Sequence, residues 1–402
     1  MQLIRPDTNF DFMGRRGLFC TASGIAVLAS WVLLVYPGPK YGIDFTGGTQ
    51  MHVPFGKGID TGQVRAALAK SGYHNAEVVA LGKRQGEFLI TVQESSPVSE
   101  QEERQARARL VKEFADQGIV EDSFDLSESG DRLQVRFTEE VDVARLEKAI
   151  RDAGLLVREH TDDEVASSNE DGGQQEACTA PICRLLPLNE YKYEARLVGV
   201  GGQVLQGLRR ELSEDRVGDP LRTIYVGPKV GEQLKWQAIK ALLYAMGFIM
   251  LYIAVRFDLR FAPGAIIALF HDVSITLGIF VLTRNEVSLT VVAALLTIVG
   301  YSINDTVVIY DRIRENMQKL RERELPLVMN KAINETLSRT IFTSVATMLA
   351  IVAIFVFGGG QIRDFAFAMI IGIVVGTYSS IYIASPLTVV IDQLFSRRQV
   401  AG

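Results

Sequence analysis

Two opposite charges lie in the otherwise apolar C-terminal part of the sequence. Asp305 belongs to the apolar stretch Val287–Ile309, and Arg339 comes just before the apolar stretch Ile341–Phe357. If these stretches form antiparallel helices, each charge lies 18 residues from the outer end of its stretch. That separation is ~27 Å at a rise of about 1.5 Å per residue. The two charges are therefore expected at the same depth.

A carboxylate and a guanidinium at one depth can neutralise each other, which makes both tolerable in a medium of low dielectric constant. Ionisable residues at membrane depth commonly mark ion or proton pathways. The same two residues also fit a purely structural ion pair at the cytoplasmic edge of a membrane. The spacing alone leaves both interpretations open.

The composition divides the chain into a polar and an apolar part. Its 402 residues are 48% hydrophobic, and the mean hydropathy is +0.16. Residues 40–235 hold 25 basic and 34 acidic side chains, whereas the other residues hold 17 and 13. The first part is therefore acidic and water-soluble, and the second is apolar with basic edges. Such modest acidity argues against a nucleic-acid partner, and three cysteines are too few for a disulfide framework.

Six stretches are long and apolar enough to cross a hydrocarbon core of ~30 Å. They are residues 17–36, 238–255, 261–282, 287–309, 341–357 and 365–394. Arginine and lysine gather on one side of these stretches, so the positive-inside rule predicts that both termini, including residues 1–16, and the loop 310–339 are cytoplasmic. Residues 37–236 then form a large domain outside, and residues 237–398 form a five-helix domain. The first stretch is expected to stay as an anchor, because its apolar run is too long for a signal peptide and no cleavage site follows it.

The outer region repeats strand–helix–strand patterns. Strand-like runs occupy residues 49–55, 88–92, 133–137 and 221–226, and amphipathic helical runs occupy residues 61–71, 142–153 and 203–212. Split β-α-β halves of this kind predict an α+β domain of ferredoxin-like type. Residues 161–176 are acidic and poor in apolar side chains, which predicts a mobile loop.

Two sets of residues, one within the third span and one after the first span, invite a chemical interpretation. His271 and Asp272 lie midway along the third span, where they form either a proton relay or an interhelical packing pair. Asp44, Gly47 and Gly48 belong to the run GIDFTGGT after the first span. That run lacks the Lys-Ser or Lys-Thr ending of a phosphate loop. It therefore indicates a turn at the membrane exit that Asp44 caps or ties.

Cys178 and Cys183 follow the acidic segment of the outer region. Outside the cytoplasm they could close a small disulfide loop, and two free thiols are the alternative. Their spacing is not that of a zinc site. We recognise no metal site, cofactor site or catalytic set in the outer region, and we expect no enzymatic activity.

Six ordered runs of residues resemble the SecF family. They are YGIDFTGGT (41–49), VGPKVGEQL (226–234), YIAVRF (252–257), ALFHDV (268–273), YSINDTVVIYDRIRENM (301–317) and NETLSRTIFTS (334–344). SecF is the smaller partner of the SecD–SecF accessory pair of the bacterial Sec protein-export machinery, which is related to the resistance-nodulation-division transporters. The outer domain of this chain is considerably larger than is usual in that family. Residues from about 95 to 190 therefore take no role from the resemblance.

The resemblance implies an α-helical inner-membrane protein with six transmembrane helices and a large ferredoxin-like α+β periplasmic domain between the first two. It implies SecD, the Sec translocon and an unfolded exported polypeptide as partners, with membrane lipids around the spans and no cofactor. Proton movement would drive motion of the outer domain in late-stage translocation. Asp305 would accept the proton, and Arg339, when released, would turn to Thr343 one helical turn further on.

Two other functions remain open. The chain could be half of a proton-coupled transporter of a small molecule or lipid, or a passive membrane scaffold in which the charges are structural. An export subunit predicts slower secretion when it is lost, and a scaffold predicts that replacing Asp305 by asparagine is harmless.

Overall fold

The structure, a computed structural model, describes residues 9–400 except 82–85, 95, 97, 120–123, 128, 159–180, 185–190, 258–259 and 320–323. It divides into two compact units. Met1–Phe45 and Gln233–Gly402 form one, which we call the helical unit, and Thr46–Glu232 form the other, the α/β unit. The acidic run 161–176 lies outside the described residues.

The helical unit consists of long apolar helices. Its helices are α1 (Arg16–Val35), α7 (Pro228–Arg256, whose first turn belongs to the α/β unit), α8 (Ala262–Leu282), α9 (Leu289–Lys319), α10 (Leu325–Phe357), α11 (Gln361–Ser379) and α12 (Ser385–Val400). A π-helical turn, Ser380–Ala384, joins α11 to α12. Within the described residues, six helices or joined helices are long and apolar enough to cross a membrane, the sixth being Gln361–Gln393. Each of them contains or overlaps one of the six stretches expected from the sequence.

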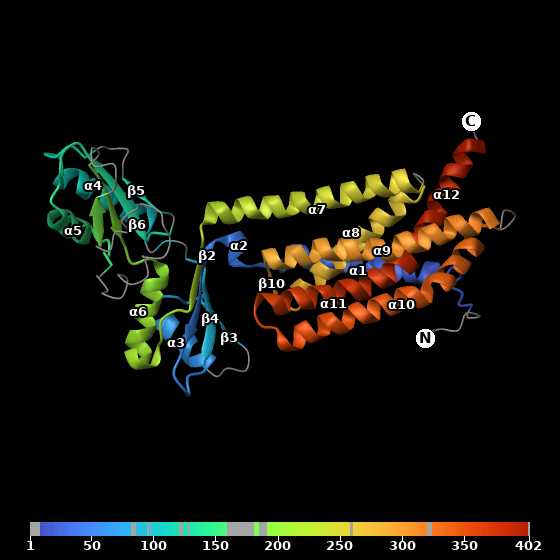
Figure 1. The fold of residues 1–402 in the computed structure, drawn as a ribbon, viewed down its shortest axis with the longest axis horizontal. Coiled ribbons are helices and arrows are strands. Elements are labelled where there is room, and N and C mark those ends of the chain that lie inside the picture. Colours follow the sequence, from blue (N-terminus) through green and yellow to red (C-terminus); the bar gives the residue numbers. More distant parts are fainter. Residues whose placement is uncertain are drawn as a thin grey trace, which may run out of the picture. The chain divides into compact units, whose positions relative to one another are not determined.

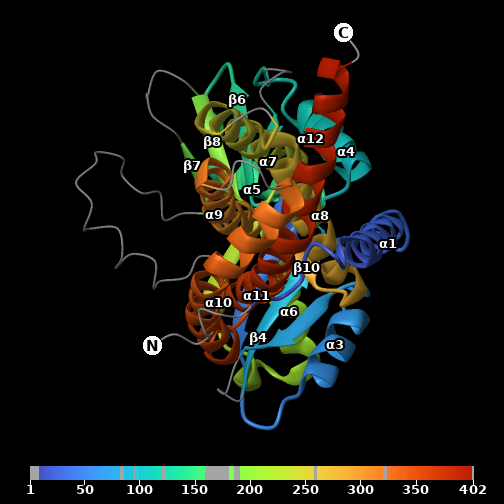
Figure 2. The same cartoon turned by 90° about the vertical axis from the view of Figure 1, so that its right-hand side faces the viewer.

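Helix α9 lies in the middle of the helical unit, packed against α8, α10 and α11. These helices run alongside one another in both views (Figure 1, Figure 2). Gly372 and Gly376 of α11 leave room for Ile298 and Ser302 of α9, because a Cβ atom at either glycine would meet those side chains. Small residues let helices approach closely inside a membrane, where the hydrophobic effect cannot drive them together.

The region 310–339 differs from the loop expected from the sequence. Helix α9 continues to Lys319 and α10 begins at Leu325, so the described residues of this region are helical except for Glu324. Pairs of opposite charge one helical turn apart, such as Lys319 and Glu315, favour helix over loop in a polar segment. The basic residues that the structure describes here, such as Arg312 and Lys331, therefore lie on helical extensions beyond the apolar spans.

The α/β unit contains two four-stranded antiparallel sheets. The first has the chain order β2 (Gly48–Pro54), α3 (Thr61–Lys70), β3 (Glu77–Ala80), β4 (Glu87–Val92), α6 (Val200–Leu212), β9 (Arg222–Val226). Its strands lie in the order β3-β4-β2-β9. Helices α3 and α6 pack against each other, and their buried side chains share a core with the sheet (Figure 2).

The second sheet is inserted between β4 and α6. Its chain order is α4 (Glu100–Glu113), β5 (Asp125–Leu126), β6 (Arg132–Phe137), α5 (Val143–Asp152), β7 (Ile182–Arg184), β8 (Tyr191–Arg196), and its strand order is β5-β6-β8-β7. If α4 and β5 are moved to the end of this series, both the chain order and the strand order match those of the first sheet. The insertion is therefore a circular permutation of the same arrangement.

The insertion has a hydrophobic core of its own, formed by both helices and the sheet. Tyr193 is almost fully buried there. Its hydroxyl accepts a hydrogen bond from the Val141 N–H and donates one to the Val141 carbonyl oxygen, each at 3.1 Å. A separate core of this kind is what lets an inserted segment fold as a body of its own.

Candidate functional site

Asp305 lies on the buried face of α9. Its exposed fraction is 3%, and its Oδ2 atom is buried without a hydrogen bond. A carboxyl group in such surroundings loses its hydration without full compensation, which makes its charged form costly. The helix continues for more than three turns past this residue, so Asp305 lies within regular helix.

Arg339 lies on α10, and its positive charge acts on Asp305. The structure contains no hydrogen bond or ion pair between these two side chains. Arg339 is largely exposed, whereas Asp305 is buried. The two predicted residues are thus brought into electrostatic range but are not in contact.

Thr343, the third predicted residue, lies one turn beyond Arg339. Its hydroxyl donates to the Thr340 carbonyl oxygen at 3.0 Å. Thr340 itself is buried, and its hydroxyl oxygen has no hydrogen-bond partner. The sequence analysis missed Thr340, although buried hydroxyls at Thr336, Thr340 and Ser344 repeat every four residues and could have indicated a polar stripe on this helix.

His271 and Asp272 form the second polar centre, on α8. Asp272 is fully buried. Its Oδ1 atom lies 2.9 Å from Nδ1 of His271, and its Oδ2 atom accepts hydrogen bonds from Ser302 of α9 at 2.6 Å and Ser379 of α11 at 2.8 Å. Asp272 therefore joins three helices. The two serines were not singled out in the sequence, because nothing in their spacing shows which helices meet at Asp272.

The other nitrogen of His271 is buried and unpartnered. His271 lines a cavity of about 260 Å³ between α1, α8 and the π-helical end of α11. Ser23 of α1 lines the same cavity, and its hydroxyl lies 2.9 Å from the Tyr378 hydroxyl. The walls are otherwise mainly apolar, so the cavity favours an apolar filling.

Within the run GIDFTGGT, Ile43–Thr46 form a single helical turn, α2, and Asp44 makes its contact outside this run. Its Oδ2 atom accepts a hydrogen bond from the N–H of Leu289, the first residue of α9, at 2.8 Å. Gly47 and Gly48 both have positive φ, 76° and 135°. A Cβ atom at Gly47 would also lie 2.9 Å from backbone atoms of Pro228, so glycine is required there by both conformation and space.

The chain ahead of α1 is bound to the start of α10. The Asn334 Oδ1 atom accepts from the N–H of Phe10 and Asn330 Oδ1 accepts from the N–H of Phe12, each at 2.8 Å. Both amide nitrogens donate to the Phe10 carbonyl oxygen, at 2.9 and 3.0 Å. Two asparagines one turn apart thus hold an extended piece of backbone.

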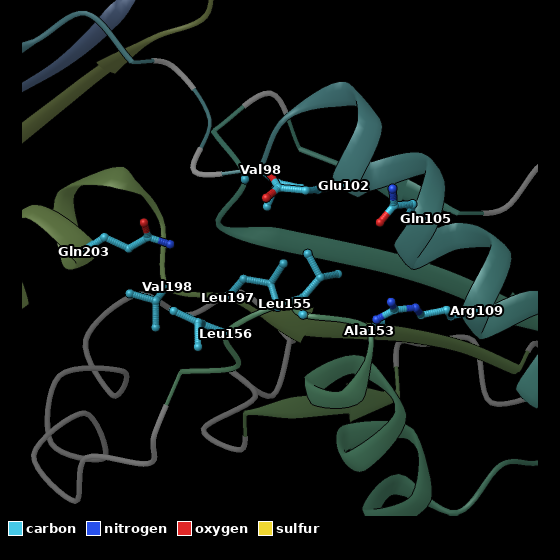
Figure 3. Close-up of a pocket in the computed structure, with 12 residues that line it drawn as sticks. Val98, Glu102, Gln105, Arg109, Ala153, Leu155, Leu156, Leu197, Val198 and Gln203 are labelled. Carbon is cyan, nitrogen blue, oxygen red and sulfur yellow. The ribbon is translucent and has the colours of Figure 1, made fainter. Parts of the chain in front are cut away.

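The insertion also contains a cavity, of about 260 Å³ (Figure 3). Glu102, Gln105 and Arg109 of α4 lie on one side of it, and Leu155 and Leu197 lie on the other. The polar groups serve the local structure, since Glu102 belongs to the capping box of α4 and Arg109 donates to a backbone oxygen at the end of α5. We assign no function to this cavity.

Cys178 lies outside the described residues, so its pairing with Cys183 stays a prediction.

Comparison with known proteins identifies the class of membrane protein. Residues 216–394 match the family model of the SecD/SecF protein-export membrane protein C-terminal region, and residues 32–59 match that of the SecD/SecF GG motif. The SecF translocase subunit of Koribacter versatilis is 34% identical over 412 residues, covering 100% of this chain and 96% of that protein. The SecF subunit of Magnetococcus marinus is 35% identical over 403 residues, covering 100% and 98%.

A solved structure shows the same resemblance. The crystal structure of SecDF from Thermus thermophilus matches 97% of this chain and 40% of that chain, with a TM-score of 0.60 and 29% identity. The chain belongs to the SecF family of protein translocase subunits, as its sequence motifs indicated, and is a multi-pass inner-membrane protein of the Sec export system.

Proposed function

We propose that this chain works with a SecD partner to couple proton movement to late-stage export of unfolded polypeptides. The proposal rests on the family and on one observation, the buried Asp305 carboxyl group with an oxygen free of hydrogen bonds. The SecDF relatives support SecD as the partner, since in Thermus thermophilus one protein bears both names.

Proton binding at Asp305 changes the electrostatics around α9 and α10. When the carboxyl group is ionised, it attracts Arg339; when it is protonated, that attraction is lost. The Thr340 hydroxyl is buried and has no hydrogen-bond partner, so its oxygen can then accept a hydrogen bond from a neighbouring donor. Thr343 is the other hydroxyl within one turn of Arg339. A local change of charge of this kind can shift the packing of two helices.

The proposed orientation follows the positive charges. Arg312 and Lys319 lie on the extension of α9 beyond its apolar span, and Lys331 lies on the facing extension of α10. Such residues favour the cytoplasmic side. Both termini then lie in the cytoplasm, and the α/β unit lies in the periplasm.

We further propose that both bodies of the α/β unit are of ferredoxin-like type. The chain order β-α-β-β-α-β with the strand order β3-β4-β2-β9 supports this assignment for the first, and the permuted order supports it for the insertion. Motion of these bodies would act on the exported polypeptide.

For His271 and Asp272 we favour a packing role over a proton relay. Both oxygens of Asp272 already accept hydrogen bonds, three in all, from His271, Ser302 and Ser379. A buried carboxylate with both oxygens hydrogen-bonded to neighbouring helices stabilises one arrangement of those helices rather than two. Asp272→Asn is expected to lower the thermal stability of the protein, whereas a relay would instead show as a changed pH profile of export.

An export assay tests the proposed function. In cells that rely on this chain, the Asp305→Asn variant should accumulate normally while the export of a pulse-labelled secreted protein slows. Dissipating the proton gradient should slow export in the wild type and have little further effect in the variant. Normal export by Asp305→Asn at normal accumulation would favour the passive scaffold instead.

A further inference from the structure

The six residues Lys40–Phe45, which come shortly after the first span, are attached to the beginning of α9. Lys40 and Tyr41 form β1, which pairs in parallel with β10 (Glu286–Val287). The next residue, Gly42, donates its N–H to the Val287 carbonyl oxygen at 2.9 Å. Backbone hydrogen bonds of this kind fix the register of the two segments, so they move together.

Asp44 extends this attachment onto α9 itself. Its carboxylate accepts the N–H of Leu289 at 2.8 Å, and that N–H belongs to the first turn of the helix, where backbone N–H groups have no helical acceptor. A negative charge at this end is also favoured by the helix dipole. The residue that satisfies the helix end thus comes from a segment 245 positions away in the chain.

The attached segment ends where the α/β unit begins. Phe45 is buried in the core of the helical unit, and the next residue, Thr46, is the first of the α/β unit. Gly47 and Gly48 follow with φ of 76° and 135°. Gly47 lies against the backbone of Pro228, and Gly48 is paired with Val226 of β9, so both residues are part of the start of the α/β unit.

We propose that Asp44 is the positioning residue through which α9 moves the start of the α/β unit at Gly47 and Gly48. This inference rests on the proposed function, because the movement begins at Asp305. Asp305 lies 16 residues after Leu289 in the same helix, about 24 Å along it. A shift or rotation of α9 is therefore carried along a rigid helix to its first residue. From there, the Asp44 hydrogen bond and the β1–β10 pair carry it to Thr46, where the α/β unit begins.

The experiment compares distance distributions between spin labels in the full chain, reconstituted in lipid with its three cysteines replaced by serine. One label is at Arg65, exposed on α3, and the other at Thr283, exposed after α8. Asp305→Asn serves at constant pH as a permanently neutral form of that side chain. We expect Asp305→Asn to shift the distribution in the parent chain.

When Asp44 is replaced by alanine, we expect the shift caused by Asp305→Asn to be lost. When Asp44 is replaced by asparagine, we expect the shift to be retained, because asparagine also accepts a hydrogen bond at a helix N-terminus. Thr290→Ala is the matched control. Thr290 lies in the same first turn and loses only a side-chain hydrogen bond to Gln361, so the shift should persist.

Three outcomes would contradict these claims, and they point to different steps. If Asp305→Asn shifts the distribution equally with and without Asp44, the link through Asp44 is wrong, and the proposed function stands. If Asp305→Asn produces no shift in the parent chain although the chain is folded, the coupling between the charge and the α/β unit is itself wrong. Loss of the shift in both Asp44 variants would also contradict the proposal, since a hydrogen-bond acceptor would then not suffice.

Discussion

Replacing Asp305 by asparagine should separate stability from activity. The two side chains have nearly the same shape, so the packing of α9 against its neighbours is kept. Asparagine cannot ionise, and it therefore cannot bind and release a proton. Asp305 is 3% exposed and has a carboxyl oxygen without a hydrogen bond, so the charge is held at an energetic cost that the amide avoids.

The size of that cost follows from the environment. An aspartate at the centre of a membrane helix is less favourable by about 2.5–3.5 kcal/mol on insertion scales, which is an upper bound for Asp305, nearer the inner end of its span. A buried amide group without partners costs about 1–3 kcal/mol. The difference favours asparagine by on the order of 1 kcal/mol, so the variant should unfold at the same temperature as the wild type or slightly higher. Coupling between two sites is typically worth about 1–3 kcal/mol, or about 5- to 150-fold. We expect the export rate of the variant to decrease by a factor within that range.

The assay measures both quantities on one set of variants. Thermal unfolding of the purified protein gives stability, and pulse-labelled secretion gives the export rate at matched accumulation. Asn304→Ala is the control, because Asn304 precedes Asp305 on α9 and is exposed. Export at the wild-type rate by Asp305→Asn would refute the coupling argument. A clear loss of stability would instead refute the assumption that the buried charge is costly.

Four further outcomes are expected. Gly47→Ala should destabilise the protein by about 1–2 kcal/mol or more, because alanine is strained at φ 76°, and accumulation in the membrane measures this. Tyr193→Phe should cost about 1–3 kcal/mol of stability, since it leaves a buried backbone N–H unpaired; limited proteolysis of the insertion in urea detects it. Partial burial raises the pKa of Asp131, but two serine hydroxyls and a neighbouring arginine lower it further, below its usual value. The stability that Asp131 adds is therefore complete above the ordinary carboxyl pKa of about 3.9 and is lost as the pH falls through the lower folded value, and acid titration of Asp131→Asn should lack this loss. Asn330→Ala combined with Asn334→Ala should speed amide hydrogen exchange in residues 9–14, whereas unchanged exchange would show that the two amides do not hold that segment.

The sequence predicted the helical unit well because membrane spans depend on length and composition. Each expected span overlaps a helix or joined helix of the structure. However, α9 ends later than expected, at Lys319, and α10 begins earlier than expected, at Leu325. Hydropathy detects where apolar residues stop, and it does not detect a polar helix that continues into water. Charge pairs one turn apart, such as Glu315 with Lys319, carried the missing signal.

The permuted insertion was harder to anticipate. Four expected elements correspond closely to elements of the structure. They are the helices 142–153 (α5) and 203–212 (α6) and the strands 133–137 (β6) and 221–226 (β9). Strand pairing, however, joins residues far apart in the chain, and local alternation does not specify which strands are neighbours. Local sequence patterns therefore could not predict the strand order β5-β6-β8-β7.

The candidate site shows the same difference: the sequence indicates which residue types matter, whereas it does not indicate which groups they contact. Residue type and depth identified Asp305, Arg339, His271 and Asp272. The role of Asp44 was misjudged, because its partner, the N–H of Leu289, comes from a distant helix and backbone groups have no sequence signature. Contacts made by backbone atoms need the fold before they can be located.

The two buried aspartates of the helical unit differ in a way that explains why one should switch and the other should not. Both oxygens of Asp272 are hydrogen-bonded to groups on three helices, so a proton at Oδ2 would compete with the hydroxyls of Ser302 and Ser379. Asp305 has an oxygen without a hydrogen bond, and the charge that acts on it, Arg339, is not in contact with it. A proton can therefore bind Asp305 without displacing a hydrogen bond at that oxygen. Ser302 and Asp305 lie one turn apart on α9, so a hydrogen bond to Asp272 and a carboxyl group that can take up a proton are neighbours on this helix.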